Sequence, residues 1–366
     1  SKRWVIKIGS ALITNDGQGL NADAIKSWTE QIADLRATGK EVLLVCSGAV
    51  AEGMARIGWK KRPHALHELQ AAAALGQMGL IQQFESCFKH HQIHTAQVLL
   101  THEDLSNRQR YLNARSTLKT LLTLGAIPII NENDTVATEE IRYGDNDRLA
   151  ARVAQLVMAD ALILLSDVDG LYTSDPGSDD SAEHIPEVVR ITGDIQRMAG
   201  ETRSDIGSGG MATKVQAARI ATHAGCSTVI ASGTIERPLD TLAAGGTCTV
   251  FRAEGTPAAA RKQWLAGVLE VRGELRLDDG AVSALNDGKS LLPVGVVEVI
   301  GNFRRGDVVT LVDAAGNELG RGLAEYSDEE AEKLAGCHSE QIEEKLGYRG
   351  RSVMVHRDEL VLFDHD

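Results

Sequence analysis

Residues 21–46 read NADAIKSWTEQIADLRATGKEVLLVC, a polar helical pattern followed by a short apolar run. The segment 21–38 has helical length and period, and Gly39 stands where a left-handed residue commonly ends a helix. The run 41–46 does not alternate between apolar and polar residues, so it predicts a strand that is buried on both faces. A helix followed by such a strand is the repeating unit of an α/β protein.

The same unit recurs along the first two-thirds of the chain. Further strands of this buried kind are predicted at 4–8, 96–100, 126–130, 161–165 and 227–231, and further helices at 67–89, 107–124, 146–158 and 210–224. This alternation predicts a mainly parallel open sheet sandwiched by helices. Ligands of such sheets bind beyond the carboxyl ends of the strands, so the residues that follow each strand are the candidates for a functional site.

The sequence changes character after about residue 253. Residues 253–261 are rich in alanine and suggest a linker, and short strand-like runs follow at 274–277, 296–300, 307–312 and 352–356, with one helix at 327–334. Short strands at this spacing predict a small β-barrel-like domain. Because 366 residues exceed the size of most single cores, we expect a first domain at 1–253, a linker at 254–271 and a second domain at 272–366.

The charge and the cysteine content argue against several classes of protein. The net charge is −13, whereas a nucleic-acid binder usually carries a basic surface. Residues 272–366 hold 11 basic and 20 acidic residues, a net of −9, so the second domain is the more acidic part. The five scattered cysteines have no zinc spacing and suggest free thiols in a reducing compartment. With no apolar run of membrane length and no signal peptide visible, we expect no membrane partner and a cytoplasmic protein.

Two glycine-containing segments follow predicted strands. In KIGS at 7–10, Gly9 would let a phosphate approach the backbone and Lys7 would supply positive charge, although a plain glycine turn has the same pattern. In SGAVAEG at 47–53, donors at a helix start could hold a carboxylate or phosphate, and a structural turn with a serine cap fits equally well.

Three further polar segments lie at the same predicted edge. In NEND at 131–134 and GDND at 144–147, Asp134 could bind an ammonium group, Asn146 could bind by hydrogen bonds and Asp147 could orient lysines; a solvated loop is the alternative. SDVDGLY at 166–172 could contact a nucleotide or simply form a turn. GSGGMATK at 207–214 precedes a helix and suits an anion, but it has the order of neither a Walker loop nor a dinucleotide-binding loop, and a mobile loop without chemistry is the alternative.

Together these residues favour phosphoryl transfer over hydride transfer or hydrolysis. Phosphoryl transfer needs positioning and charge stabilisation more than covalent chemistry. A carboxylate acceptor is already ionised at neutral pH, so the reaction needs no general base, and no histidine is assigned a role.

The motifs also resemble a known family. They include VIKIGSALIT (5–14), CSGAVAEG (46–53), QVLLT (97–101), IPIINENDTVAT (127–138), YGDND (143–147), DVDGLYTSDP (167–176), GSGGMATKVQAA (207–218), SLLPVGVVEVIGNFRRGD (290–307) and VMVHRDEL (353–360). Nearly end to end, the chain resembles the glutamate 5-kinases of the amino acid kinase family, and residues 272–366 look like the PUA domain that bacterial members often carry. Two positions depart from the family pattern: Ser10-Ala11 stands for Thr-Ser and Ser166 for Thr, so Ala11 lacks the hydroxyl that the family pattern has there.

The resemblance implies ATP-dependent phosphorylation of the γ-carboxylate of L-glutamate, with Mg²⁺ bound to ATP, as the first step of proline biosynthesis. It implies catalytic roles for Lys7, Lys214 and Asp147, and glutamate binding by Ser47, Asp134 and Asn146. The residues implied to contact the nucleotide are Lys7, Gly9, Gly48, Ser166, Asp167, Ser208, Gly209, Gly210, Met211, Ala212, Thr213 and Lys214.

The resemblance also implies partners: proline as feedback inhibitor, a homo-oligomer (dimer or tetramer) and a glutamyl phosphate reductase as a possible recipient of the product. Two alternatives stay open. The chain could phosphorylate another small carboxylate such as N-acetylglutamate, or it could bind RNA through its second domain. The net charge of −9 in that domain argues against RNA, because phosphate contacts need lysine and arginine.

Overall fold

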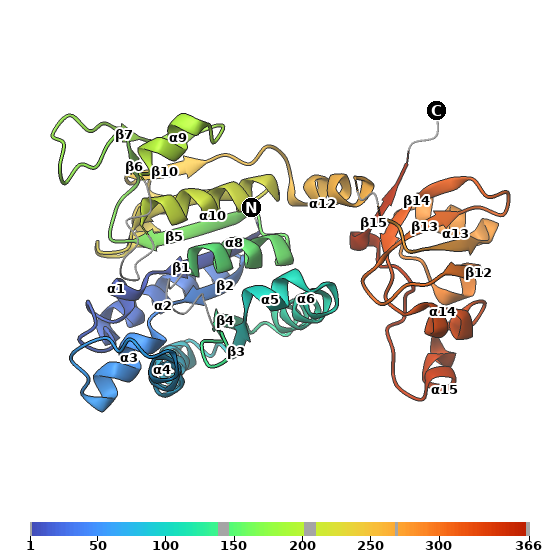
Figure 1. The fold of residues 1–366 in the computed structure, drawn as a ribbon, viewed down its shortest axis with the longest axis horizontal. Helices are drawn as coiled ribbons and strands as arrows, with labels where there is room; N and C mark the ends of the chain where they lie inside the picture. Colours follow the sequence, from blue (N-terminus) through green and yellow to red (C-terminus); the bar gives the residue numbers. More distant parts are fainter. Residues whose placement is uncertain (1, 138–145, 201–209, 268–269, 364–366) are drawn as a thin grey trace. The chain divides into compact units, whose positions relative to one another are not determined.

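The computed structural model describes residues 2–137, 146–200, 210–267 and 270–363. The chain divides into two compact units (Figure 1), of which the first comprises Ser1–Ser106 with Asn113–Pro257, and the second Asn107–Leu112 with Ala258–Asp366. Each unit has a hydrophobic core of its own. The predicted fold class, an α/β domain followed by a small β domain, is confirmed.

An eight-stranded, mainly parallel sheet forms the centre of the first unit. Its order is β3-β4-β2-β1-β5-β9-β10-β8, and the strands are β3 (Thr95–Leu100), β4 (Ile127–Glu132), β2 (Glu41–Cys46), β1 (Arg3–Ile8), β5 (Ala161–Ser166), β9 (Ser227–Ser232), β10 (Cys248–Phe251) and β8 (Glu187–Val188). All six predicted strands are present. The prediction that each is buried on both faces is wrong for β3, which lies at the edge of the sheet and is largely half-exposed.

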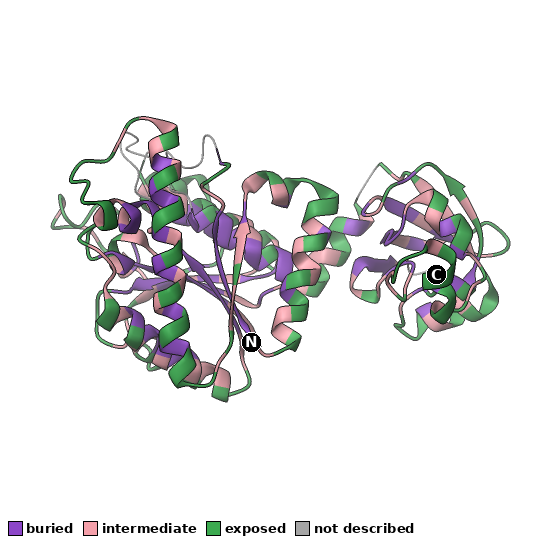
Figure 2. Ribbon diagram, turned by 90° about the horizontal axis from the view of Figure 1, so that it is seen from below, coloured by how far each residue is buried: buried purple, intermediate pink, exposed green. Residues whose placement is uncertain are grey.

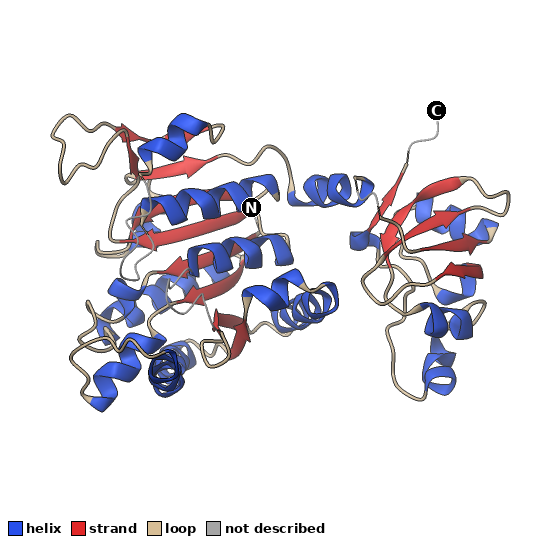
Figure 3. Cartoon of the chain, viewed as in Figure 1, coloured by secondary structure: helices blue, strands red, loops and turns tan. Residues whose placement is uncertain are grey.

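Helices cover both faces of this sheet (Figure 3). On one face, α2 (Ala22–Ala37) and α4 (Leu66–His90) enclose the main core, which includes Ile6 and Ile8 of β1. On the other face lie α8 (Asn146–Val157) and α10 (Met211–His223). Successive strand residues point to opposite faces, so Lys7 points toward α8 and α10. The central strands are almost entirely buried (Figure 2).

The remaining elements of the first unit are short, except for α6, which spans both units. They are α1 (Ser10–Ile13), α3 (Ala49–Ile57), α5 (His102–Ser106), α6 (Arg108–Thr123), β6 (Leu171–Tyr172), β7 (His184–Ile185), α9 (Gly193–Met198) and α11 (Pro238–Ala243). No helix in the described residues is long and apolar enough to cross a membrane.

Helices α3 and α4 pack with their backbones in close contact, which fixes the start of α3 against α4. A Cβ atom added at Gly76 of α4 would lie 1.9 Å from the carbonyl oxygen of Ala49, and one at Gly53 would lie 1.7 Å from that of Ala72. Such distances require backbone movement, so glycine at these positions permits the close packing.

We therefore expect Gly76→Ala to lower the free energy of unfolding by about 2–3 kcal/mol, because overpacking outweighs the gain in helix propensity. Gly79→Ala in the same helix is the matched control. There the three atoms nearest to the new methyl group belong to the flexible guanidinium of Arg56 rather than to the backbone, and the propensity gain is the same. Thermal or urea unfolding measures both variants, and equal stability of the two would contradict this role of Gly76.

The second unit holds a five-stranded sheet in the order β12-β11-β13-β14-β15. Its elements are α12 (Pro257–Ala266), β11 (Gly273–Leu277), α13 (Asp279–Asn286), β12 (Val296–Gly301), β13 (Val308–Val312), β14 (Glu318–Leu323), α14 (Asp328–Leu334), α15 (Ile342–Leu346) and β15 (Leu360–Leu362). The predicted helix at 327–334 is present, with Ser327 and Glu330 forming a capping box at its start.

Sequence patterns misplaced two parts of this unit. The predicted strand at 352–356 forms only a single bridge, Val355 to Leu291, whereas β14 and β15 were missed. The sequence of β14 contains two glycines. Because glycine is depleted in strands, the pattern did not predict a strand there. Within the expected linker, residues from Pro257 form α12, because proline at the first helical position and a run of alanines favour a helix.

Candidate active site

Two buried lysines share one buried aspartate on the α8/α10 face of the sheet. Lys7 Nζ lies 2.6 Å from Asp147 Oδ1, and Lys214 Nζ lies 3.3 Å from Asp147 Oδ2. The three side chains are 7%, 5% and 1% exposed for Lys7, Lys214 and Asp147. They come from β1, α10 and α8, so the fold brings together residues that are more than 200 positions apart in the sequence.

The charge of this lysine–aspartate cluster is unbalanced. The two ammonium groups and the one carboxylate carry a net positive charge between them, which attracts an anion such as a phosphoryl group. Burial raises the pKa of Asp147, but Lys7 and Lys214, together with hydrogen bonds from Lys7 and Thr213, lower it below its ordinary value. Asp147 is therefore the anionic member of the cluster.

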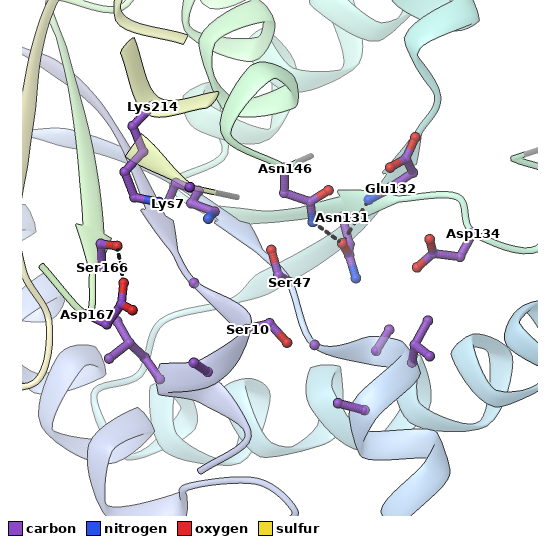
Figure 4. Close-up of a pocket in the computed structure, with 18 of the residues that line it drawn as sticks. Lys7, Ser10, Ser47, Asn131, Glu132, Asp134, Asn146, Ser166, Asp167 and Lys214 are labelled. Atoms are coloured by element: carbon purple, nitrogen blue, oxygen red, sulfur yellow. Dashed lines mark hydrogen bonds between the residues drawn. The ribbon is translucent and has the colours of Figure 1, made fainter. Parts of the chain in front are cut away.

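The cluster adjoins a cavity whose middle is lined by amides (Figure 4). Asn146 Nδ2 donates to Asn131 Oδ1 at 2.8 Å and to the carbonyl oxygen of Cys46 at 2.5 Å. Asn131 in turn donates to Gln77 Oε1 at 2.7 Å. Both hydrogens of Asn146 Nδ2 are used in these bonds, which fix the orientation of the side chain. Asn146 lines the cavity.

Ser47 and Asp134 line the same cavity. The buried Ser47 hydroxyl has no hydrogen-bond partner within the described residues, and an unpartnered buried hydroxyl is costly unless a ligand or water satisfies it. Asp134 is half-buried, and burial raises its pKa to about 6, although the charge of Arg62 acts in the opposite direction. Arg62 also lines the cavity.

The residues predicted to contact a nucleotide divide into three groups. Lys7, Gly9, Gly48, Ser166, Asp167, Gly210, Met211 and Lys214 line the cavity. Thr213 instead lies 3.0 Å from Asp147 Oδ2 through its hydroxyl, and Ala212 lines a separate hollow beside α9. Ser208 and Gly209 lie outside the described residues.

One predicted role needs correction. The Gly9 amide was expected to face a phosphate, but it donates to the Leu165 carbonyl oxygen at 3.2 Å and thereby extends the pairing of β1 with β5. Gly48 lines the cavity in the left-handed conformation, with φ of 101°, and a Cβ atom there would lie 2.8 Å from Thr14 Cγ2. Glycine is therefore required at Gly48 by the local backbone.

Sequence reasoning missed two contributors to this site, Arg62 and Gln77. Arg62 lies between α3 and α4, and Gln77 lies within α4, so neither follows a strand. Among the described residues there is also no cluster of three or more His, Cys, Asp or Glu side chains that could hold a metal ion.

Comparison with known proteins agrees with this architecture. The model of the amino acid kinase family matches residues 2–232, which is more than half of the chain, and that of the PUA domain matches residues 267–346. The chain belongs to the amino acid kinase family.

The relatives are similar to this chain over nearly their whole length. The glutamate 5-kinase of Nitrosospira multiformis is 57% identical over 99% of this chain and 98% of its own length. The glutamate 5-kinases of Ralstonia pickettii (56% identical, 99% and 97% covered) and Pseudomonas savastanoi pv. phaseolicola (55%, 99% and 99%) are similar over the same extent. The resemblance stated from the motifs is thereby confirmed.

Proposed function

We propose that the chain transfers the γ-phosphoryl group of ATP to the γ-carboxylate of L-glutamate, giving L-glutamyl 5-phosphate, the first step of proline biosynthesis. The similarity to glutamate 5-kinases over nearly the full chain supports this substrate and reaction. The single structural observation that carries it is the lysine–aspartate cluster, which holds a net positive charge at the edge of the sheet where ligands bind.

The chemistry fits such a cluster. The bond between the γ-phosphorus and the β,γ-bridging oxygen breaks, a new bond forms between that phosphorus and a γ-carboxylate oxygen, and ADP leaves with the released charge. No proton is moved, because the acceptor is ionised at neutral pH. Lys7 and Lys214 stabilise the transferred group's oxygens, and Asp147 holds the two ammonium groups in place.

The substrate residues take complementary roles. Asp134 binds the ammonium group of glutamate, and Ser47 donates to or accepts from its polar groups. Asn146 accepts through Oδ1, because both hydrogens of its Nδ2 are already donated to the protein. Ser166, Asp167, Gly210 and Met211 contact the nucleotide. Mg²⁺ would enter with ATP and would supply positive charge to its phosphate groups.

The test is ATP-dependent formation of hydroxamate in the presence of hydroxylamine, which traps an acyl phosphate. We expect product with L-glutamate and at most about 1% of that rate with N-acetylglutamate or carbamate, since a site built for an ammonium group rejects analogues that lack it. Aspartate keeps the ammonium group but is one methylene shorter, so we expect it to react about 10–200-fold more slowly. Turnover with another member of this panel but not with glutamate would replace the substrate. No turnover with any of them would lead to a salt-dependent tRNA-binding assay of the alternative function.

The resemblance to glutamate 5-kinases adds three further expectations to this proposal. Inhibition by proline, a homo-oligomeric state and transfer of the labile acyl phosphate to a reductase follow from the resemblance. A cytoplasmic location fits the five cysteines, none of which forms a disulfide.

A further inference from the structure

The cavity holds positive charge at two places that differ in their surroundings. Lys7 and Lys214 both contact Asp147, next to the site of phosphoryl transfer. In the view of Figure 4, Asp134 lies on the other side of Ser47 and Asn146 from these lysines. Arg62 is the third cation lining the cavity within the described residues, and Asp134 lines the same cavity. The positive charge of Arg62 opposes the rise in the pKa of Asp134.

An α-amino acid needs two opposite charges at one end. Its ammonium and α-carboxylate groups are attached to the same carbon atom, so a residue that binds the ammonium must have a partner for the carboxylate beside it. If Asp134 takes the ammonium group, the α-carboxylate comes to lie next to Asp134 and far from Lys7 and Lys214, which face the γ-carboxylate and the phosphoryl group. An uncompensated carboxylate next to Asp134 would be repelled.

We propose that Arg62 is a specificity-determining residue that binds the α-carboxylate of the substrate, beside the ammonium group held by Asp134. A guanidinium presents two parallel N–H donors and so matches a carboxylate better than a lysine does. Arg62 is exposed on its loop while it also lines the cavity, so it can meet the substrate at the mouth without the cost of a fully buried charge. This inference rests on the proposed function and adds the recognition of the α-carboxylate to it.

The experiment compares L-glutamate with L-isoglutamine, in which the α-carboxylate is an amide while the ammonium and γ-carboxylate groups are unchanged. In the wild-type enzyme we expect kcat/KM to be about 100-fold higher for glutamate. Arg62→Gln is expected to lower kcat/KM for glutamate by about 30–100-fold, mainly through KM, and to leave the value for isoglutamine within about three-fold. The preference for glutamate should therefore nearly vanish.

Two further variants complete the test. Arg62→Lys keeps the charge but loses the fork of donors, so it should restore part of the preference. Lys61→Gln removes the neighbouring exposed cation, which does not line the cavity, and should leave both substrates unaffected. The thermal unfolding midpoint of each variant serves as the check of folding.

Two results would overturn the proposal. If Arg62→Gln lowered kcat/KM equally for both substrates, Arg62 would act only through Asp134, because both substrates carry the ammonium group. If it kept the full preference for glutamate, the α-carboxylate would be bound elsewhere. Failure of the proposed function is distinct from both, since the wild-type enzyme would then form no hydroxamate from glutamate.

Discussion

Lys214→Met is expected to lower kcat by about 10²–10³-fold while KM for glutamate stays within about three-fold. Methionine fills the volume of the lysine stem but removes one of the two ammonium groups that contact Asp147. The net charge of the lysine–aspartate cluster then changes from positive to zero. The transferring phosphoryl group loses an ammonium group that stabilises its charge, and water cannot replace that group in a buried site. Hydroxamate formation under saturating MgATP and glutamate measures the loss.

A control separates this effect from the substitution itself. Lys26→Met makes the same change on the exposed surface of α2, which covers the opposite face of the sheet. It should leave kcat unchanged. The unfolding midpoint of Lys214→Met should also stay close to that of the wild type, because the variant relieves the repulsion between the two ammonium groups that contact Asp147. A turnover of Lys214→Met within a few-fold of the wild type would exclude Lys214 from the transition state.

The sequence predicted the part of the site that depends on the topology of a parallel sheet. Lys7, Ser47, Asp134 and Ser166 each lie at or just after the end of a predicted strand, and such ends meet at one edge of the sheet. Their common location in one cavity follows from strand assignment alone, without knowledge of any side-chain contact.

What the sequence could not predict depends on contacts that local patterns do not contain. The link from Gln77 through Asn131 to Asn146 joins a helix to a strand end 54 residues away. Arg62 lines the cavity from the connection between α3 and α4, two helices that pack closely through Gly53 and Gly76, and no local pattern reveals that packing. The use of the Gly9 amide by the sheet is likewise set by the pairing of β1 with β5, which the sequence of β1 alone does not reveal.

The pH dependence of substrate binding provides the second large expected effect. Burial raises the pKa of Asp134 to about 6, against the opposing charge of Arg62. Only the ionised carboxylate attracts an ammonium group, so kcat/KM for glutamate should fall about tenfold per pH unit below 6. The ammonium and carboxylate groups of glutamate do not titrate near that pH. Asp134→Asn should lower kcat/KM by about 100-fold at pH 8 and remove this dependence between pH 5 and pH 7.

ATP itself requires a control, because its terminal phosphate also titrates near pH 6. The pH profile that remains in Asp134→Asn reports this contribution, and subtracting it isolates that of Asp134. If wild type and Asp134→Asn had parallel profiles, the carboxylate would not be the titrating group in binding.

The raised pKa of Asp134 also predicts that its ionised form, which supports substrate binding, lowers the stability of the fold. A carboxyl group whose pKa is higher in the folded than in the unfolded protein destabilises the fold when it is ionised. For Asp134 this loss of stability is complete above about pH 6 and disappears as the pH falls toward the ordinary pKa of 3.8. Asp134→Asn should therefore unfold at a higher temperature than the wild type at pH 8, and the difference should shrink as the pH is lowered toward 4. A residue that costs stability while it supports binding is expected of a site that is completed by its substrate, since the ammonium group supplies positive charge beyond that of Arg62.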